Sequence, residues 1–471
     1  MNTIAHAGLS ISQLRTEFAG RVITPEDAQY DEARAVFVPQ VDRRPALIVR
    51  PLDAGEVSRV VTLAHESGLE LAVRSGGHSG AGHGASEGGI VLDLSLMKAL
   101  DIDADRRVAW AETGLTAGEV TSALGTHGLA VGFGDTASVG IGGLTLGGGV
   151  GYLVRKHGLT IDDVLAADVV TADGRLLRAD PEQHSDLFWA IRGGGGNFGV
   201  ATRFQYRLQP LETVTGGMLV LPATPEVVAS FIAAAEAAPD ELSTIANVMP
   251  APPLPFVPAE HHGRLVVLAM LVHAGPTEAG ERALAPFRAL AKPIADLLRP
   301  MPYPEIYPPE EGDYRPLATG RTLFVETIDV SVAGRILDLL RSSTAQMPVA
   351  QLRVLGGAMA RVPAEATAFA HRTSRIMLNL AAVYATPDEA PVHEAWVAAG
   401  ADALRQDDPG AYVNFLADEG SERVRAAYPG PTWERLAAIK RRYDPTNLFR
   451  LNQNITPAAD GRAEPAEGDR A

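Results

Sequence analysis

The chain of 471 residues has 41 Lys and Arg against 57 Asp and Glu, a formal net charge of −16, and 46% of its residues are hydrophobic. So acidic a chain disfavours nucleic acids and anionic membranes as partners, because both are bound through positive patches. It contains no cysteine, which excludes disulfides, thiolate nucleophiles and Cys-ligated metal centres. No secretory signal opens the chain and no apolar stretch reaches the ~18 residues of a membrane span, so we expect a cytoplasmic protein.

Residues 42–210 alternate short apolar strands with helical patterns. A helix is predicted over 54–68, where apolar residues recur at i, i+3 and i+4 and Gly68 ends the pattern, and another over 116–128 with Thr116 as N-cap. Asp173-Gly174 between two apolar runs predicts a two-residue hairpin. The remaining predicted strands cover 46–51, 69–74, 88–95, 107–114 and 200–208. The pattern as a whole contains too many hairpins for a purely doubly wound sheet, so it favours an α+β fold.

Beyond residue 211 the pattern changes to longer Ala/Leu-rich helices joined by Pro-rich connections. Two such loops are predicted at 249–263 and 299–312. Strands of a second sheet are predicted at 322–332 and 376–385, and a basic helix at 431–445. The tail from residue 457 has the composition of a disordered segment.

Glycine forms three clusters, "RSGGHSGAGHG" (74–84), "GFGDTASVGIGGLTLGGGVGYL" (132–153) and "RGGGGNFGV" (192–200). Glycine permits positive φ and removes Cβ, so such runs let backbone N–H groups converge on an anion or pass against a flat ring. Each cluster alone could be a surface loop. Three of them within 130 residues, each after an apolar strand or helix, favour a ligand site.

A nicotinamide site is the first alternative, because Gly194, Gly196 and Gly199 spell G-x-G-x-x-G. The surrounding pattern is reversed, since 185–194 is predicted as a helix and 200–208 as a strand. The dinucleotide fingerprint requires strand, turn and then helix. A near match at Gly80-x-Gly82-x-x-Ala85 leads into more turns, so neither match favours a nicotinamide dehydrogenase.

Three stretches resemble the flavin domain of FAD-linked oxidoreductases of the vanillyl-alcohol-oxidase type, whose FAD-binding domain is called PCMH-type: "RSGGHSGAG", "GLTLGGGVGYLVRKHGLTIDDVLAADVVTADGRLL" and "DLFWAIRGGGGNFGVATRF". The segment "YVNFLADEG…RLAAIKRRYDPTNLFRLNQNI" resembles the terminal signature of the berberine-bridge-enzyme-like branch. The resemblance covers about 42–210 and 410–455, and only loosely 211–405.

The resemblance implies an α+β fold with a two-part PCMH-type FAD-binding domain and a substrate domain whose antiparallel sheet is covered by helices. The implied domains are 1–210 for FAD, with its core at about 42–210, and 211–405 for substrate. Residues 406–456 would return to the FAD domain, and 457–471 would be a disordered tail.

In that family the GGHS loop wraps the FAD diphosphate and its histidine carries the flavin through an 8α-methyl bond, which here implies His78. Backbone N–H groups and the Ser75 and Ser79 hydroxyls could donate to phosphate oxygens. Thr136 stands where some members have a second, cysteinyl attachment, so only the histidyl linkage or tight noncovalent binding is open. The FAD contacts expected from the resemblance are Arg74, Ser75, Gly76, Gly77, His78, Ser79, Thr136, Ser138, Gly142, Gly143, Gly148, Tyr152, Val200 and Asn414.

The implied reaction removes hydride from a C–H bond bearing a hydroxyl or amine and passes it to flavin N5, while a base takes the other proton. Tyr412 is the expected base, or else a residue that only packs against the flavin, and it would need a cationic or hydrogen-bonding neighbour because a free tyrosine has a pKa of ~10. Tyr412 and Asn414 belong to a family motif Y-x-N-Y, whose last tyrosine is here Phe415. Asn379 is expected to orient the substrate, and Tyr384 to form a further pocket wall.

The expected substrate is a sugar, glycoside or secondary metabolite, with O2 or another acceptor reoxidising the flavin. The alternatives are a nicotinamide dehydrogenase and a flavin-binding protein without catalytic activity. No metal site is expected, because His261-His262 lacks further ligands at suitable spacing. The sequence leaves the substrate and the oligomeric state open.

Overall fold

A four-stranded sheet at the N-terminal end carries the first glycine cluster. The computed structural model describes residues 10–307 and 315–459. The sheet has the order β1-β2-β4-β3, with β2 and β3 parallel to β4 and β1 antiparallel to β2. Its strands are β1 (Val22–Ile23), β2 (Leu47–Val49), β3 (Leu71–Arg74) and β4 (Ile90–Asp93), and η1 (Leu94–Leu96) follows.

Three helices accompany this sheet: α2 (Ile11–Glu17), α3 (Tyr30–Arg34) and α4 (Ala54–Ser67). The helix predicted at 54–68 is confirmed as α4, which begins where the Asp53 carboxylate accepts from the N–H of Glu56 and ends at Gly68 with φ 66°. Its valines at 57, 60 and 61 are fully buried in the core that it shares with the sheet.

A second, antiparallel sheet has the order β5-β6-β10-β8-β9 and follows in the chain. A hairpin joins β8 and β9 at Asp173-Gly174, as predicted, with φ 76° at Gly174. Its loop has three residues and not the predicted two, because the N–H of Thr171 donates to the Arg175 carbonyl across residues 172–174. Thr116 caps α5, as predicted, and the cap is a reciprocal capping box with Glu119. The elements of this part are β5 (Leu100–Asp103), β6 (Val108–Glu112), α5 (Ala117–Gly125), α6 (Ile141–Gly147), α7 (Val154–His157), η2 (Thr160–Asp162), β8 (Val164–Val170), β9 (Leu176–Ala179), α8 (Ser185–Ala190), η3 (Gly195–Asn197) and β10 (Val200–Arg207). A two-stranded sheet of β7 (Leu129–Ala130) and β11 (Gln209–Pro210) completes it.

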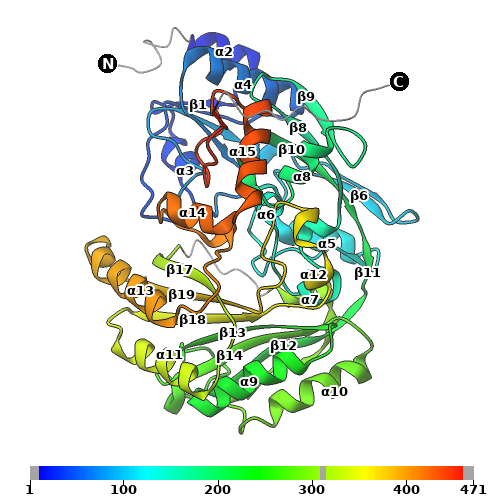
Figure 1. Ribbon diagram of the computed structural model, residues 1–471. Helices are drawn as coiled ribbons and strands as arrows, with labels where there is room; N and C mark the ends of the chain where they lie inside the picture. Colours follow the sequence, from blue (N-terminus) through cyan, green and yellow to red (C-terminus); the bar gives the residue numbers. More distant parts are fainter. Residues whose placement is uncertain (1–9, 308–314, 460–471) are drawn as a thin grey trace.

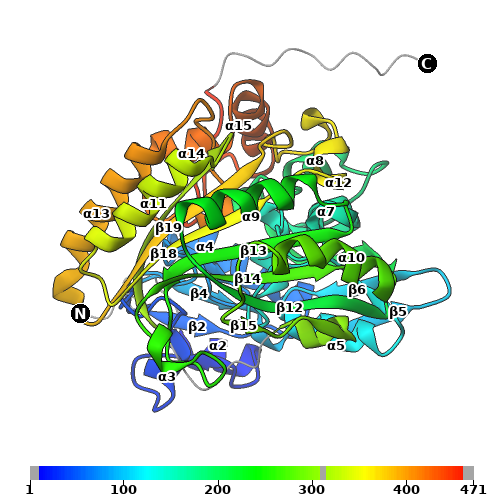
Figure 2. The same ribbon diagram turned by 90° about the horizontal axis from the view of Figure 1, so that it is seen from below.

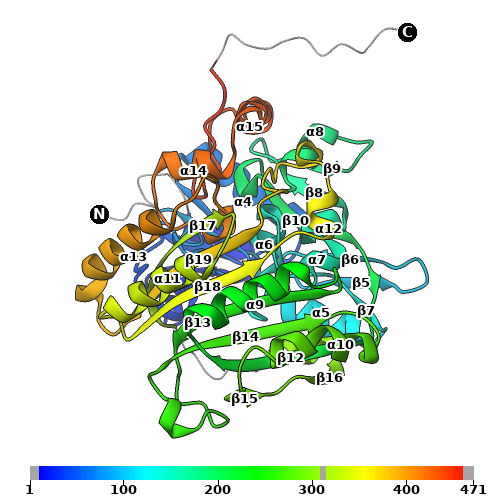
Figure 3. The ribbon, with the colours of Figure 1, turned by 60° about the horizontal axis from the view of Figure 1, so that its bottom comes forward.

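The middle of the chain forms an eight-stranded antiparallel sheet. Its strand order is β15-β12-β14-β13-β18-β19-β17, with β16 paired to β12. Figures 2 and 3 show its long helices lying along one face of the sheet. The strands are β12 (Thr213–Pro222), β13 (Leu242–Pro250), β14 (Leu265–His273), β15 (Ala295–Asp296), β16 (Arg299–Pro302), β17 (Leu317–Val325), β18 (Met347–Val354) and β19 (Ile376–Tyr384). The helices are α9 (Pro225–Ala237), α10 (Thr277–Arg288), α11 (Val330–Ser342) and α13 (Ala390–Leu404), with η4 (Ala259–His261), η5 (Tyr303–Ile306) and η7 (Pro387–Glu389) in the connections.

The strand predicted over 322–332 is wrong in its second half. Strand β17 ends at Val325, and Asp329 caps α11 by accepting from the N–H of Val332. The β-branched residues after Val325 suggested a strand. They instead include Val332, the start of a buried stripe with Ile336 and Leu340 at helical spacing.

The C-terminal segment returns to the N-terminal part. Figure 1 shows α14 and α15 beside the N-terminal sheets, away from α9 and α10. Leu436 and Tyr443 of α15 belong to the same buried core as α8 and β10. The segment contains η8 (Val413–Phe415), α14 (Ser421–Ala427) and α15 (Pro431–Tyr443), preceded by α12 (Ala358–Arg361) and η6 (Ala364–Ala366).

The predicted α+β class, with an antiparallel sheet covered by helices, is confirmed. Of the tail predicted to be disordered from 457, Ala458 still donates its N–H to Ala437 O at 3.0 Å. Residues 460–471 lie outside the described residues. In the two described ranges no helix combines the length and apolar character required to cross a bilayer.

Candidate active site

A cavity of about 870 Å3 lies between the glycine clusters and the face of the eight-stranded sheet that the helices leave uncovered. This sheet is called the large sheet below, and its uncovered face the bare face. This volume is near the upper end of the range for small-molecule sites, about 300–1,000 Å3. Residues far apart in the sequence contribute to its wall, within the ranges 37–41, 71–84, 134–150, 195–201, 318–321, 351–353, 379–381, 412–419 and 449–453. All three glycine clusters therefore meet at one cavity.

The first and second clusters cross at Gly76 and Gly140. A Cβ at Gly76 would overlap the backbone N and Cα of Gly140, so neither chain leaves room for a side chain. The Ser75 hydroxyl donates to the Thr113 carbonyl and accepts from the N–H of Gly142 at 3.3 Å. Its single proton is thus used within the protein, so the structure gives no support to the expected hydrogen bond from the Ser75 hydroxyl to a phosphate.

The imidazole of His78 forms part of the cavity wall. It stacks on Phe37 with ring centroids 4.3 Å apart and planes 19° apart, and its Nε2 lies 3.1 Å from Ser138 Oγ. Ser138 comes from the second glycine cluster and does not itself line the cavity. One face and one nitrogen of the ring are therefore fixed by the protein.

The structure brings most of the expected FAD contacts into the cavity wall. Those that line it are Arg74, Ser75, Gly76, Gly77, His78, Ser79, Thr136, Gly142, Gly143, Val200 and Asn414. The Arg74 guanidinium is turned to Asp93 Oδ2, at 3.0 Å, and to the Ala33 carbonyl. It therefore supports the sheet below the loop.

Gly148 and Tyr152 lie behind the cavity wall. A Cβ at Gly148 would meet the Phe369 and Tyr412 rings. The Tyr152 phenol is buried against Tyr307 and faces the Asp135 carbonyl. These two residues shape the wall from behind, so the structure gives no support to a direct FAD contact by either of them.

Tyr412 lies in the cavity wall with its side chain almost completely buried. Its hydroxyl accepts from the N–H of Gly149 at 2.9 Å and from Asn414 Nδ2 at 3.0 Å. Burial raises the pKa of Tyr412, whereas these two donors, the Val150 N–H and the Arg353 charge act to lower it. The phenol is therefore protonated near neutral pH, but it is surrounded by the groups that a phenolate requires.

The bare face of the large sheet presents a row of four polar residues. Thr322, Asn379, Gln351 and Asn247 are directly paired across β17, β19, β18 and β13. Gln351 is engaged, since it donates to Asn247 Oδ1 at 3.0 Å and accepts from Arg353. Asn379 lines the cavity and makes no side-chain hydrogen bond within the described residues, which leaves its amide for a ligand.

Tyr384 does not form the pocket wall that the sequence suggested. Its ring stacks on His393 of α13, with centroids 5.2 Å apart, on the helix-covered face of the sheet. Successive strand residues point to opposite faces. Tyr384 is five residues from Asn379, so the two side chains must lie on opposite faces.

Sequence reasoning missed Arg353 and Glu419, two buried charged residues of the cavity wall. Arg353 Nη2 pairs with Asp135 Oδ2 at 2.6 Å, and the Arg353 guanidinium lies 5.0 Å from the Phe415 ring centroid. Glu419 Oε2 accepts from Arg321 and Arg423, while its Oε1 is buried without a hydrogen-bond partner among the described residues. For Arg353 the alternation of strand 347–354 was the available signal, and for Glu419 it was its place in the C-terminal segment "YVNFLADEG".

The wall has the properties of a cofactor cradle. A Cβ at Gly80, Gly143 or Gly196 would meet no protein atom within 4 Å, although all three residues line the cavity. Their missing side chains therefore leave space for a ligand. The G-x-G-x-x-G run at 194–199 lies between α8 and β10, the helix-then-strand order that excludes a dinucleotide fingerprint. Within the described ranges no three His, Asp or Glu side chains are grouped closely enough to hold a metal ion.

Comparisons with known proteins support an FAD site in this cavity. A family model described as "FAD binding domain" matches residues 45–180, and one described as "Berberine and berberine like" matches residues 411–456. The (R)-6-hydroxynicotine oxidase of Paenarthrobacter nicotinovorans is 32% identical over 459 residues, covering 93% of this chain and 97% of that protein. The xylooligosaccharide oxidase of Thermothelomyces thermophilus is 29% identical over 450 residues, 88% of each chain.

Among solved structures, 6-hydroxy-D-nicotine oxidase from Arthrobacter nicotinovorans superposes with a TM-score of 0.81 at 28% identity, covering 93% of this chain and 98% of that one. Chitooligosaccharide oxidase gives the same TM-score at 21% identity, which supports the fold alone. The chain belongs to the FAD-linked oxidoreductases of the vanillyl-alcohol-oxidase type, in their berberine-bridge-enzyme-like branch, and is an FAD-dependent oxidoreductase.

Proposed function

We propose that this enzyme oxidises a C–H bond bearing a hydroxyl or amine in a sugar, glycoside or secondary metabolite, with O2 as the reoxidant. The observation that carries the proposal is Tyr412, a buried phenol in the cavity wall that accepts two hydrogen bonds. FAD, when bound, supplies the hydride acceptor at N5. The names of the relatives span both substrate chemistries, a hydroxynicotine and oligosaccharides.

In this proposal the residues divide the work of positioning and proton transfer. Tyr412, as phenolate, takes the hydroxyl or amine proton while hydride leaves the adjacent carbon. The N–H of Gly149 and the Asn414 amide keep the phenolate oxygen in place. The Asn379 amide would donate hydrogen bonds to the polar groups of the substrate or accept them, and the unpartnered Glu419 Oε1 would accept them.

We further propose that His78 holds FAD through a single covalent bond. The chain has no cysteine, so a cysteinyl attachment is impossible. Thr136, which the resemblance sets at the place of that cysteine, lines the cavity. Phe37 and Ser138 hold the His78 ring in one orientation. Joining an imidazole nitrogen to the 8α-methyl carbon would release the N–H proton and one methyl proton and leave two electrons on the flavin, which O2, the reoxidant proposed above, would accept. Oriented reactants lower the barrier to bond formation.

Acid precipitation tests the linkage. The yellow colour should stay with the precipitated polypeptide of the purified protein and be released from a His78→Ala variant. A colourless pellet from the unaltered protein would refute the bond and leave FAD bound noncovalently.

Anaerobic mixing with a panel of sugars, phenolic alcohols and secondary amines tests the reaction. At least one class should bleach the flavin absorbance, and air should restore it. If only the amines bleach it, the carbohydrate part of the proposal is wrong. If no member does, the proposed reaction fails although the protein binds FAD.

A further inference from the structure

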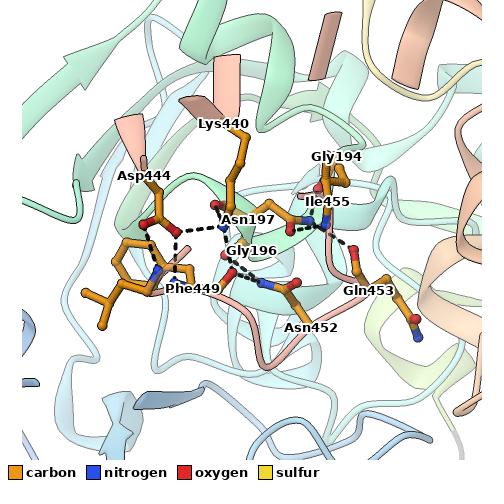
Figure 4. A network of polar contacts seen from close by, with 10 residues as sticks. Gly194, Gly196, Asn197, Lys440, Asp444, Phe449, Asn452, Gln453 and Ile455 are labelled. Carbon is orange, nitrogen blue, oxygen red and sulfur yellow. Dashed lines mark hydrogen bonds and ion pairs between the residues drawn. The ribbon is translucent and has the colours of Figure 1, made fainter. Parts of the chain in front are cut away.

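Lys440 is a fully buried cation that does not touch the cavity. Its ammonium donates to Asn197 O at 2.7 Å, to Asp444 Oδ2 at 2.6 Å and to Phe449 O at 2.8 Å (Figure 4). An ammonium has three N–H donors, so all are used. The three acceptors belong to different parts of the chain: the third glycine cluster, the end of α15 and the loop after it.

The groups around Lys440 extend this connection. The Asp444 carboxylate accepts from the N–H groups of Leu448 at 2.8 Å and Phe449 at 2.9 Å. The Asn197 side chain accepts from the N–H of Ile455 at 2.9 Å and donates to the Gly194 and Gln453 carbonyls. Figure 4 shows these contacts as one continuous network. We call Lys440, Asp444 and Asn197 the buried clamp.

The two segments joined by the clamp form one side of the cavity. Gly195, Gly196, Asn197, Gly199 and Val200 line it from the glycine cluster, and Phe449, Leu451, Asn452 and Gln453 line it from the C-terminal loop. The loop 444–459 contains no helix or strand. The loop therefore lacks the backbone hydrogen bonds of a helix or sheet, and hydrogen bonds to the clamp fix its position in the cavity wall.

Stability alone does not explain a buried ion pair. Removing an ammonium from water is costly, and well-packed apolar residues in place of such a pair are often neutral or stabilising. A point cation with three donors can fix three carbonyl or carboxylate oxygens at one position, whereas an apolar side chain cannot. The arrangement matches a group that supports a binding wall from behind.

We propose that Lys440 is a positioning residue for FAD: by joining the third glycine cluster to the C-terminal loop, the clamp preorganises one wall of the cofactor site. This inference rests on FAD binding and is independent of the substrate proposed above. In the unclamped chain, FAD would have to order both segments when it binds, and its affinity would fall by that cost.

The test compares two double substitutions in a His78→Ala protein, in which FAD can dissociate. Lys440→Met with Asp444→Asn neutralises the clamp. The matched control, Arg372→Met with Asp162→Asn, neutralises another buried ion pair, with N–O distances of 2.7 and 2.8 Å, whose residues do not line the cavity. Titration of the FAD-free proteins with FAD gives the dissociation constants, and thermal unfolding without FAD gives the stabilities.

The clamp variant should bind FAD about tenfold more weakly than its parent, while the control should stay within about threefold even if its thermal midpoint falls as far. Equal losses of affinity in both variants would reduce Lys440 to a structural residue, and unchanged affinity in the clamp variant would overturn the proposal. No substrate is used, so the outcome is separate from that of the oxidation assay.

Hydrogen exchange keeps the proposal testable if the clamp variant does not fold. In the FAD-free His78→Ala protein, the amides of Leu448, Phe449 and Ile455 should already exchange slowly, because their acceptors belong to the clamp. Rapid exchange that slows only after FAD is added would mean that the cofactor orders the wall and that the clamp does not.

Discussion

The Tyr412 hydroxyl accepts hydrogen bonds from Gly149 and Asn414, and neither contact takes its proton. Because burial raises the pKa of Tyr412, the base form is scarce near pH 7. We expect the rate of flavin reduction by substrate to rise with pH up to at least about pH 9. Stopped-flow absorbance under anaerobic conditions measures it.

Tyr412→Phe removes the base and leaves the ring packing. We expect the limiting reduction rate to fall by at least about 100-fold and to lose its rise with pH, while the substrate dissociation constant changes little. Asn414→Ala should keep the pH dependence but shift it to higher pH, since one donor to the phenolate is lost. A Tyr412→Phe enzyme with the original pH profile would assign the proton transfer to another group.

At the scale of single elements, alanine should have opposite effects on stability at two glycines of the site. Gly76 faces the backbone of Gly140, so Gly76→Ala must displace one chain, and we expect a loss of about 1–3 kcal/mol or more in unfolding free energy. Gly143 lies in α6, and a methyl there would meet only the cavity. Gly143→Ala should therefore preserve or slightly raise the stability of the FAD-free protein, because alanine favours helix by about 1 kcal/mol.

FAD content separates the two variants. Gly143→Ala should fold and yet contain less FAD, because its methyl occupies cofactor space, whereas Gly76→Ala should lose both soluble protein and FAD. The absorbance ratio at 450 and 280 nm, with thermal unfolding of FAD-free protein, distinguishes these outcomes. Full FAD content in Gly143→Ala would place the cofactor elsewhere in the cavity.

Local chemistry explains which elements could be predicted. The helix after Asp53, the Thr116 cap and the hairpin at Asp173-Gly174 are determined by neighbours within a few residues. The helix and the cap are confirmed, and the hairpin is present with a loop one residue longer than predicted. The strand expected up to residue 332 failed because Asp329 caps α11, whose apolar stripe packs on the sheet. Periodicity cannot reveal that partner.

For the molecule as a whole, the site depends on contacts that span most of the chain. His78 meets Ser138, Tyr412 meets Gly149, and Lys440 meets Asn197, across separations of 60, 263 and 243 residues. Motifs identify some of these residues but not which side chains meet. Arg353 belongs to no motif, and Glu419 lies in the C-terminal signature without being distinguished by it. Their shared place in the cavity wall becomes visible only when the large sheet and the C-terminal segment close around the same cavity.

Two half-buried histidines couple the stability of this assembly to pH. Burial lowers the pKa of His83 and of His157 to about 4 each. The unfolded chain takes up a proton near pH 6.5 and the folded chain only near pH 4, so unfolding is favoured progressively as the pH falls through that window. For His83, the shift corresponds to a loss of about 2 kcal/mol in unfolding free energy between pH 7 and pH 5.

Urea unfolding at pH 7 and pH 5 tests this coupling. His83→Gln should reduce the loss of stability at pH 5 compared with the unaltered protein, whatever its effect at pH 7, because glutamine takes up no proton in the unfolded chain. The exposed His65 provides the control, and His65→Gln should leave the pH-dependent loss unchanged. An equal loss in the His83→Gln protein would show that the cavity keeps His83 accessible to protons, and that the acid sensitivity arises at other residues.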